Sequence, residues 1–189
     1  MKRFGWLIAI GVVLVIILAM VLGFAGSYNG LVKKSQAVDS QWAQVETQYQ
    51  RRYDLIPNLV STTKGYLKQE LAIFTEITQA RANYGSAQTV EDKSAASIQV
   101  ESALSRLLVI VEDNPDIKSD QVMISLMDEL AGTENRISVE RKRYNDDVRD
   151  YNTAIRSFPT NIIAGMFNFN ARQYFTSVSG ADQPPVVEF

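Results

Sequence analysis

Cysteine and histidine are both absent from this 189-residue sequence, and each absence excludes a class of chemistry. Without cysteine the chain has no disulfide, no thiol nucleophile and no lipid-modified N-terminal cysteine. Without histidine it has no imidazole base, no Cys/His zinc site and no Glu-x-x-His pair of the kind that holds di-iron centres in helical bundles. The sequence therefore predicts a protein that is not an enzyme and that holds no cofactor or metal.

An excess of basic charge is also missing. The chain has 19 Lys and Arg against 21 Asp and Glu, for a formal net charge of -2. A nucleic-acid-binding protein needs clustered basic side chains to displace counterions from phosphates. The charge balance therefore argues against nucleic acid as a partner.

Charged and strongly polar residues are missing altogether from residues 4–25, which read FGWLIAIGVVLVIILAMVLGFA. A helix of about 20 residues rises roughly 30 Å and crosses the hydrocarbon core of a bilayer. Trp6 and Tyr28 suit the two membrane interfaces. We therefore expect a retained transmembrane helix with the lipid bilayer as its partner. The competing interpretation is a signal peptide cleaved before Gly26, although the apolar run is longer than the usual signal-peptide core.

The basic residues that flank this run indicate its orientation. Lys2 and Arg3 adjoin its first residue, whereas Lys33 and Lys34 lie several residues beyond its end. The positive-inside rule then favours a cytoplasmic N-terminus and an exported C-terminal domain. Residues 1–27 are predicted to be a cytoplasmic stub and a transmembrane helix.

Helical periodicity begins directly after the apolar run. From residue 28 to residue 84, apolar side chains recur three and four positions apart and polar side chains fill the positions between them. This pattern predicts one long helix that packs against other helices. Pro57 should bend this helix without ending it, and Gly85 should close it.

Two further helices are predicted, at residues 90–113 and 119–158, and a proline follows each of them. The fold class is all-α: an N-terminal transmembrane helix followed by an elongated antiparallel helical bundle of three long helices plus a short C-terminal helix. The bundle domain is predicted to span residues 28–178, and residues 179–189 to form an irregular tail. Because the three helices differ in length, parts of their apolar stripes would stay uncovered, and we expect a homo-oligomer.

An apolar patch follows Pro159. Its members are Ile162, Ile163, Met166, Phe167, Phe169, Tyr174 and Phe175. One interpretation is that the patch caps the end of the bundle, and the other is that it docks a neighbouring subunit or a partner. Membrane contact is not expected, because three helices running out, back and out again would place this end away from the bilayer.

Four stretches of the chain carry a family resemblance: YNGLV at 28–32, RRYDLIPNLVSTTKGY at 51–66, SALSRLLVIVEDNPDIK at 102–118 and TENRISVERKRYNDDVRDYNTAIRSFPTN at 133–161. Together they resemble the LemA family of bacterial membrane proteins. The resemblance implies a bacterial source, an N-terminal transmembrane helix in the cytoplasmic (inner) membrane and a helical-bundle domain, which the orientation above places on the periplasmic side. It implies no defined biochemical activity, and some members are linked to magnetosome membrane formation.

Polar residues within these stretches are the candidate site residues. They are Arg51, Arg52, Asp54 and Asn58 around Pro57, then Glu134, Asn135 and Arg136, and finally Arg149, Asp150 and Asn152. We expect them to form a structural polar layer, with charge-assisted hydrogen bonds between helices that fix the register of the bundle. The alternative is a ligand or ion pocket at the proline.

These observations favour a membrane-anchored, non-enzymatic scaffolding protein that self-associates through its bundle and supports envelope or membrane organisation. The alternative is an adaptor or regulator of a membrane-protein partner, such as a protease, that docks through the apolar C-terminal patch. A third hypothesis, a ligand-binding receptor, would require a cavity near Pro57.

Overall fold

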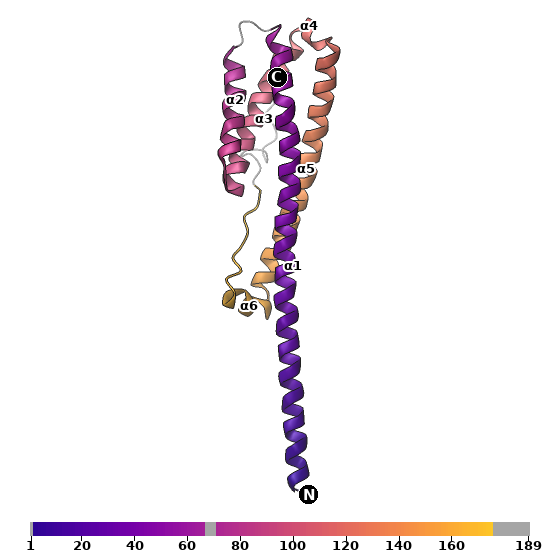
Figure 1. Ribbon diagram of the computed structural model, residues 1–189, viewed down its shortest axis with the longest axis vertical. Coiled ribbons are helices and arrows are strands. Elements are labelled where there is room, and N and C mark those ends of the chain that lie inside the picture. Colours follow the sequence, from indigo (N-terminus) through magenta and orange to yellow (C-terminus); the bar gives the residue numbers. More distant parts are fainter. Residues whose placement is uncertain (1, 67–70, 176–189) are drawn as a thin grey trace, which may run out of the picture. The chain divides into compact units, whose positions relative to one another are not determined.

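The computed structural model of the chain describes residues 2–66 and 71–175. Within these residues all regular secondary structure is helical, which confirms the all-α class (Figure 1). The irregular tail expected at residues 179–189 lies outside the described residues. The helices are α1 (Lys2–Lys64), α2 (Leu71–Ser86), α3 (Val90–Glu112), α4 (Pro115–Lys118), α5 (Gln121–Arg156) and α6 (Thr160–Met166).

Helix α1 is one uninterrupted helix that contains Pro57 and the whole apolar run. Its residues Ile10–Lys64 include a stretch that is long and apolar enough to cross a membrane, and none of that stretch is buried. Side chains such as Val15 and Leu22 are 67% and 64% exposed. Exposed apolar side chains on every face of a helix are typical of a segment that lipid surrounds.

The prediction of a single helix over residues 28–84 is wrong. Helix α1 ends at Lys64, where the Tyr66 amide donates to the Thr63 carbonyl at 3.0 Å in a tight turn, and α2 begins at Leu71. The chain reverses here, because the Phe74 ring lies 5.6 Å from the Lys64 ammonium. Gly65 lies in this turn. Both sides of the turn keep helical spacing, so periodicity alone did not reveal it.

Contacts divide the chain into two compact units. The first, here called the four-helix unit, comprises Trp42–Asn145 and Gln173–Phe189. The second, here called the α6 unit, comprises Met1–Gln41 and Asp146–Arg172.

Side-chain pairs give the directions of the helices in the four-helix unit. Helix α2 is antiparallel to α1, and α3 then runs parallel to α1 because Lys93 pairs with Glu46 at its start. Helix α5 runs back again: near its start the Tyr66 hydroxyl donates to Asp120 at 2.9 Å, and further along Tyr144 packs on Trp42. The arrangement is therefore an up-down-up-down bundle. It reverses the direction predicted for the helix at residues 119–158.

Helix α3 forms a large part of the core of this unit. Its N-cap is Thr89, whose hydroxyl accepts from the Asp92 amide at 3.0 Å, and this satisfies one of the free amides of the first turn. Leu107 and Val111 are fully buried, whereas Val109 is 60% exposed. By length and composition α3 could also cross a membrane. Its buried face and exposed face instead mark it as a core helix of the bundle.

The α6 unit has a smaller apolar cluster. Leu31 of α1 lies buried against Ile163 and Ala164 of α6. The partly buried residues packed against this cluster are Tyr28, Ala154, Ile155 and Phe169. Helix α6, in yellow-orange in Figure 1, is therefore held against the stretch of α1 that directly follows the apolar run.

Candidate functional site

Arg52 is the charged centre of the four-helix unit. It lies on α1 and is only 1% exposed. Its guanidinium forms an ion pair with Glu134 of α5 and a second with Glu101 of α3, at 3.5 Å. Arg141 of α5 pairs with the same Glu101 carboxylate at 3.3 Å. One buried cation therefore links three helices through two carboxylates.

Burial dominates the electrostatics of Arg52. Desolvation lowers the pKa of its guanidinium below the ordinary value, and the Glu101 carboxylate opposes this change. Within the described residues the Arg52 Nε has no hydrogen-bond partner. A buried charge is tolerated only when it is paired, so Arg52 depends on both carboxylates to remain inside the bundle.

Three tyrosines surround this ion-pair network. Tyr49, Tyr53 and Tyr84 are all buried, and the closest ring centroids, those of Tyr53 and Tyr84, are 4.5 Å apart. Burial raises the pKa of each of the three phenols, so all three stay neutral. In the described part of the chain, the hydroxyls of Tyr53 and Tyr84 lack a hydrogen-bond partner. The cluster contributes apolar packing at some cost in unsatisfied polar groups.

A hollow of about 390 Å³ opens beside the ion-pair network. Arg52, Glu101 and Glu134 line its charged side, and mostly apolar side chains of α3 and α5, Leu104 and Leu130 among them, line the remainder. A second hollow, of about 560 Å³, is lined by charged residues of α1 and α5: Arg51, Asp54, Asp128, Glu129 and Arg136. Pro57 and Asn58 are exposed, and neither is among the described residues that line the two hollows.

The side chains that line these hollows offer guanidinium and carboxylate groups for ion pairing, together with apolar surface. Among the described residues, no cluster of three or more acidic side chains is placed to hold a metal ion. Arg52 already has two carboxylate partners, and no thiol or imidazole exists in the chain to act as nucleophile or base. The arrangement fits a structural contact between helices better than a reaction centre.

Asn152 holds the backbone that follows α6. Its side-chain amide donates to the Arg172 carbonyl at 2.8 Å, and its side-chain oxygen accepts from the Arg172 amide at 2.9 Å. The neighbouring Tyr151 hydroxyl donates to the Asn170 carbonyl at 3.0 Å. Arg172 also pairs with Asp39 of α1 at 3.1 Å. The main-chain N–H and C=O of one residue, Arg172, are therefore both satisfied by a single side chain.

Asn145 forms the same pair of side chain to main chain hydrogen bonds in the four-helix unit. Asn145 donates to the Phe175 carbonyl at 3.0 Å and accepts from the Phe175 amide at 2.8 Å. The Tyr144 hydroxyl donates to the Gln173 carbonyl at 3.0 Å. The Phe175 ring is buried and lies 4.2 Å from the Arg141 guanidinium.

The two Tyr–Asn pairs are seven residues apart on α5, and the segments they bind are three residues apart. The repeat is visible in the sequence as YNDDVRDYN, from which Arg149, Asp150 and Asn152 were predicted as site residues but Asn145 was not. Asparagine repeated with helical spacing on the buried side of a helix was the missed signal.

The remaining candidate polar residues lie on exposed surfaces. Arg149 pairs with Asp146 and Asp150 of its own helix, at 2.9 Å and 3.2 Å, and Asn135 and Arg136 are exposed on α5. The hydrogen bond to Asp150 is the main cause of a raised pKa at Arg149. The structure thus brings together Arg52 and Glu134 from the predicted set, and it adds Glu101 and Arg141, which sequence reasoning missed.

The apolar C-terminal patch is divided between the two units. Tyr174 is exposed in the four-helix unit, where Phe175 is buried. In the α6 unit Ile163 is buried and Phe169 partly buried. Ile162, Met166 and Phe167 remain exposed there.

The expectation that this end of the chain lies far from the apolar run is wrong. The Phe167 ring packs on Phe24, within the apolar run, and on Tyr28 just beyond it, with centroids 6.0 Å and 4.8 Å apart. Phe158, the last residue of the helix predicted at residues 119–158, is 82% exposed. The reversal at Gly65, which changes the direction of α5, is the reason for the new position.

We expect the Asn152→Asp variant to release the segment around Arg172. One carboxylate oxygen of the variant can still accept from the Arg172 amide. The other replaces the NH2 group of Asn152, so a negatively charged acceptor faces the Arg172 carbonyl and that hydrogen bond is lost. Loss of such a buried hydrogen bond costs about 1–3 kcal/mol, so amide hydrogen exchange in residues 170–175 should accelerate by about tenfold or more. Mass spectrometry of hydrogen exchange would measure it. Asn161→Asp, at an exposed position of α6, is the control. Equal exchange rates in the two variants would show that Asn152 does not hold the segment around Arg172 in place.

A family model described as the LemA family matches residues 41–189, well over half of the chain. The chain belongs to the LemA family. The matched LemA region contains Arg52, both Tyr–Asn pairs and α6, and it begins after the apolar run.

Individual relatives carry two names. Magnetosome protein MamQ 1 of Paramagnetospirillum magneticum is 27% identical over 183 residues, covering 83% of this chain and 67% of the relative. Magnetosome protein MamQ of Magnetospirillum gryphiswaldense is 26% identical over the same shares. Protein LemA of Metamycoplasma hominis is 22% identical over 143 residues, covering 75% of this chain and 65% of that protein. This LemA-family chain is similar to proteins of both names.

Proposed function

We propose that this LemA-family protein is a single-pass, membrane-anchored scaffolding protein without enzymatic activity, which self-associates and supports envelope or membrane organisation. The continuity of α1 carries the proposal. The same helix begins with an exposed apolar run and ends with core residues such as Val45 and Leu59, both fully buried. Such a helix ties a folded domain directly to a bilayer.

The family comparison supports the membrane role more than any other. Relatives are named magnetosome proteins, and the sequence resemblance links some family members to magnetosome membrane formation. We place the apolar run in the cytoplasmic membrane and the helical domain on the periplasmic side, following the basic residues at the N-terminus.

Self-association has a different basis from the one that the sequence indicated. Four helices now cover one another in the four-helix unit, so unequal helix lengths no longer leave long stripes uncovered. Exposed apolar side chains on one side of α5, namely Ile124 and Val139, are the groups that a second copy would bury.

Two measurements on the full-length protein test the proposal. Membranes that contain the protein are washed with alkaline carbonate, and the protein is then extracted in a mild detergent for native mass determination. We expect retention in the membrane pellet, because an apolar helix of this length does not leave lipid, and a uniform homo-oligomer after extraction. Release by carbonate, or a mature protein that begins at Gly26, would refute the anchor. A monomer would refute self-association.

An adaptor for a membrane-protein partner is the second candidate. The exposed side chains of Ile162, Met166 and Phe167 favour it, because contiguous exposed apolar surface marks interaction sites. This function predicts a small species that co-purifies with one other membrane protein in the same extraction.

A further inference from the structure

Helix α6 exposes apolar side chains on the face that does not contact α1. Its inner face is fixed by Ile163 and Ala164, which are buried against Leu31. Ile162 and Met166, four residues apart and thus on one helix face, are 55% and 64% exposed. A seven-residue helix is too short to be stable alone, so the contact with α1 is what holds this exposed face in place.

The position of α6 along α1 coincides with the end of the apolar run. Phe167 contacts Phe24, one of the last apolar residues, and Tyr28, which lies one turn further on. In a helix that spans a bilayer, the last apolar turn and the tyrosine beyond it lie at the boundary between hydrocarbon and headgroups. The exposed residues of α6 are therefore at the depth of that boundary.

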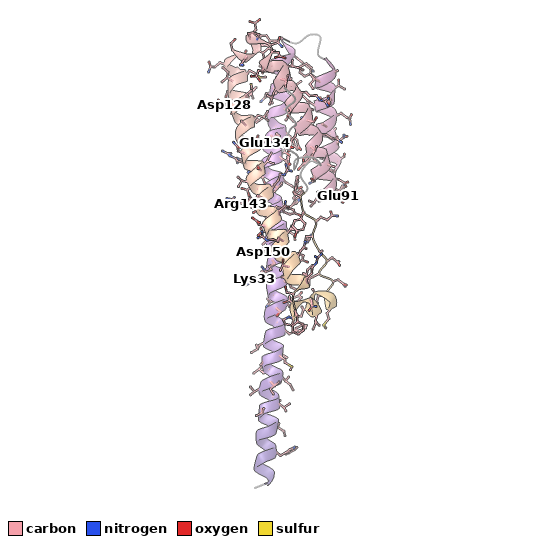
Figure 2. All side chains as sticks on the ribbon, turned by 180° about the vertical axis from the view of Figure 1, so that it is seen from behind. Lys33, Glu91, Asp128, Glu134, Arg143 and Asp150 are labelled. Atoms are coloured by element: carbon pink, nitrogen blue, oxygen red, sulfur yellow. The ribbon has the colours of Figure 1, made fainter. Side chains whose placement is uncertain are left out.

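The charges around α6 suit an anionic membrane surface. Residues 26–38 and 153–171 contain the basic residues Lys33, Lys34 and Arg156 and no acidic residue. All three basic side chains are exposed, and Figure 2 labels Lys33 on the stretch of α1 beside α6. Basic side chains next to a membrane span attract anionic lipid headgroups.

We propose that α6, together with Phe158, inserts its exposed apolar side chains into the interfacial layer of the same membrane that α1 spans. This inference rests on the proposed membrane anchor and adds a second lipid contact to it. The bilayer is the occupant that the geometry favours, because the exposed face of α6 continues the lipid-facing surface of α1. Short helices with apolar side chains on one face and basic residues nearby bind membranes in this way.

Site-directed spin labelling tests the proposal in the full-length protein. The chain has no cysteine, so a single cysteine introduces one label at a chosen site. The labelled variants are Ile162→Cys and Met166→Cys on α6, Ile17→Cys within the apolar run, and Val122→Cys on α5 as the aqueous control. Ile17 and Val122 are 51% and 59% exposed, which matches the exposure of the α6 positions. The protein is placed in nanodiscs of phosphatidylcholine and phosphatidylglycerol.

The readout is the collision rate of the label with oxygen, which concentrates in lipid, relative to a water-soluble nickel chelate. We expect labels at 162 and 166 to favour oxygen several-fold more than the label at 122, and to approach the label at 17. Labels at 162 and 166 that match the label at 122 would overturn the proposal, because α6 would then face water.

Shielding of the α6 labels from both reagents would also overturn it, because a second copy or a partner protein would then cover α6. In either of these cases a lipid signature at position 17 would leave the proposed anchor intact. Absence of a lipid signature at position 17 would instead refute the anchor, and the interfacial role of α6 with it.

Discussion

Replacing Arg52 by alanine should destabilise the four-helix unit by about 3 kcal/mol. The variant removes the one cation that pairs with both Glu101 and Glu134, and it leaves a cavity where a side chain is 1% exposed. Breaking a buried ion pair costs about 3–5 kcal/mol. The lower end applies because Glu101 keeps Arg141 as a partner and Glu134 is half exposed. Thermal unfolding in detergent, followed by circular dichroism, should show Tm lowered by about 10 °C.

Arg51→Ala is the matched control for this experiment. Arg51 precedes Arg52 on the same helix and carries the same charge, but it is exposed, and its loss should change stability by at most about 0.5 kcal/mol. Arg52→Lys should fall between the two, because an ammonium cannot span two carboxylates as a guanidinium does. Equal Tm values for the Arg51→Ala and Arg52→Ala variants would show that the buried ion pairs do not hold the helices together.

Replacing Leu107 by alanine should have an effect of similar size for a different reason. Leu107 is fully buried in α3, and truncation of a buried leucine costs about 2–5 kcal/mol through lost apolar contact and the cavity left behind. The experiment also decides between two roles of α3, which is apolar enough to cross a membrane. If α3 is a core helix, truncation of the buried Leu107 should cost much more stability than truncation of the exposed Val109. If lipid surrounds α3, neither truncation should leave a cavity, and both should have small effects.

Val109→Ala, two residues further along α3, is the control. Val109 is 60% exposed, so its truncation should change the unfolding free energy by at most about 0.5 kcal/mol. The same thermal unfolding experiment measures both variants. Similar small effects of the two substitutions would contradict the assignment of α3 to the bundle core.

Local signals in the sequence were sufficient for the elements with strong boundaries. The apolar run, the stop before Pro115 and the end of the long helix near Pro159 all appear in the structure. The turn at Gly65 was missed, because a single glycine is a weak signal when helical spacing continues on both sides of it. Because this turn was missed, the direction predicted for α5 was opposite to the observed one, and α6 was expected far from the apolar run.

Partners within the ion-pair network could not be predicted for a related reason. Arg52 was selected from the sequence, but Glu101 lies about fifty residues away on a helix whose direction depends on the turn. Which charged residues pair between helices depends on the directions of those helices. Here the directions depend on the turn at Gly65, which has only a weak signal in the sequence. Glu134 was selected, yet its contact with Arg52 also follows from the reversed direction of α5.

The side chains of the two Tyr–Asn pairs form hydrogen bonds with main-chain atoms, and this affects which residues can change during evolution. In the described residues the side chains of Asn145 and Asn152 bind main-chain atoms of Phe175 and Arg172, which every amino acid except proline presents alike. Substitution of a residue between these two positions, such as Tyr174, should therefore leave the hydrogen bonds of Asn145 and Asn152 intact. Across the family, we expect the two asparagines and their seven-residue interval to persist while exposed residues between the two bound positions, such as Tyr174, vary.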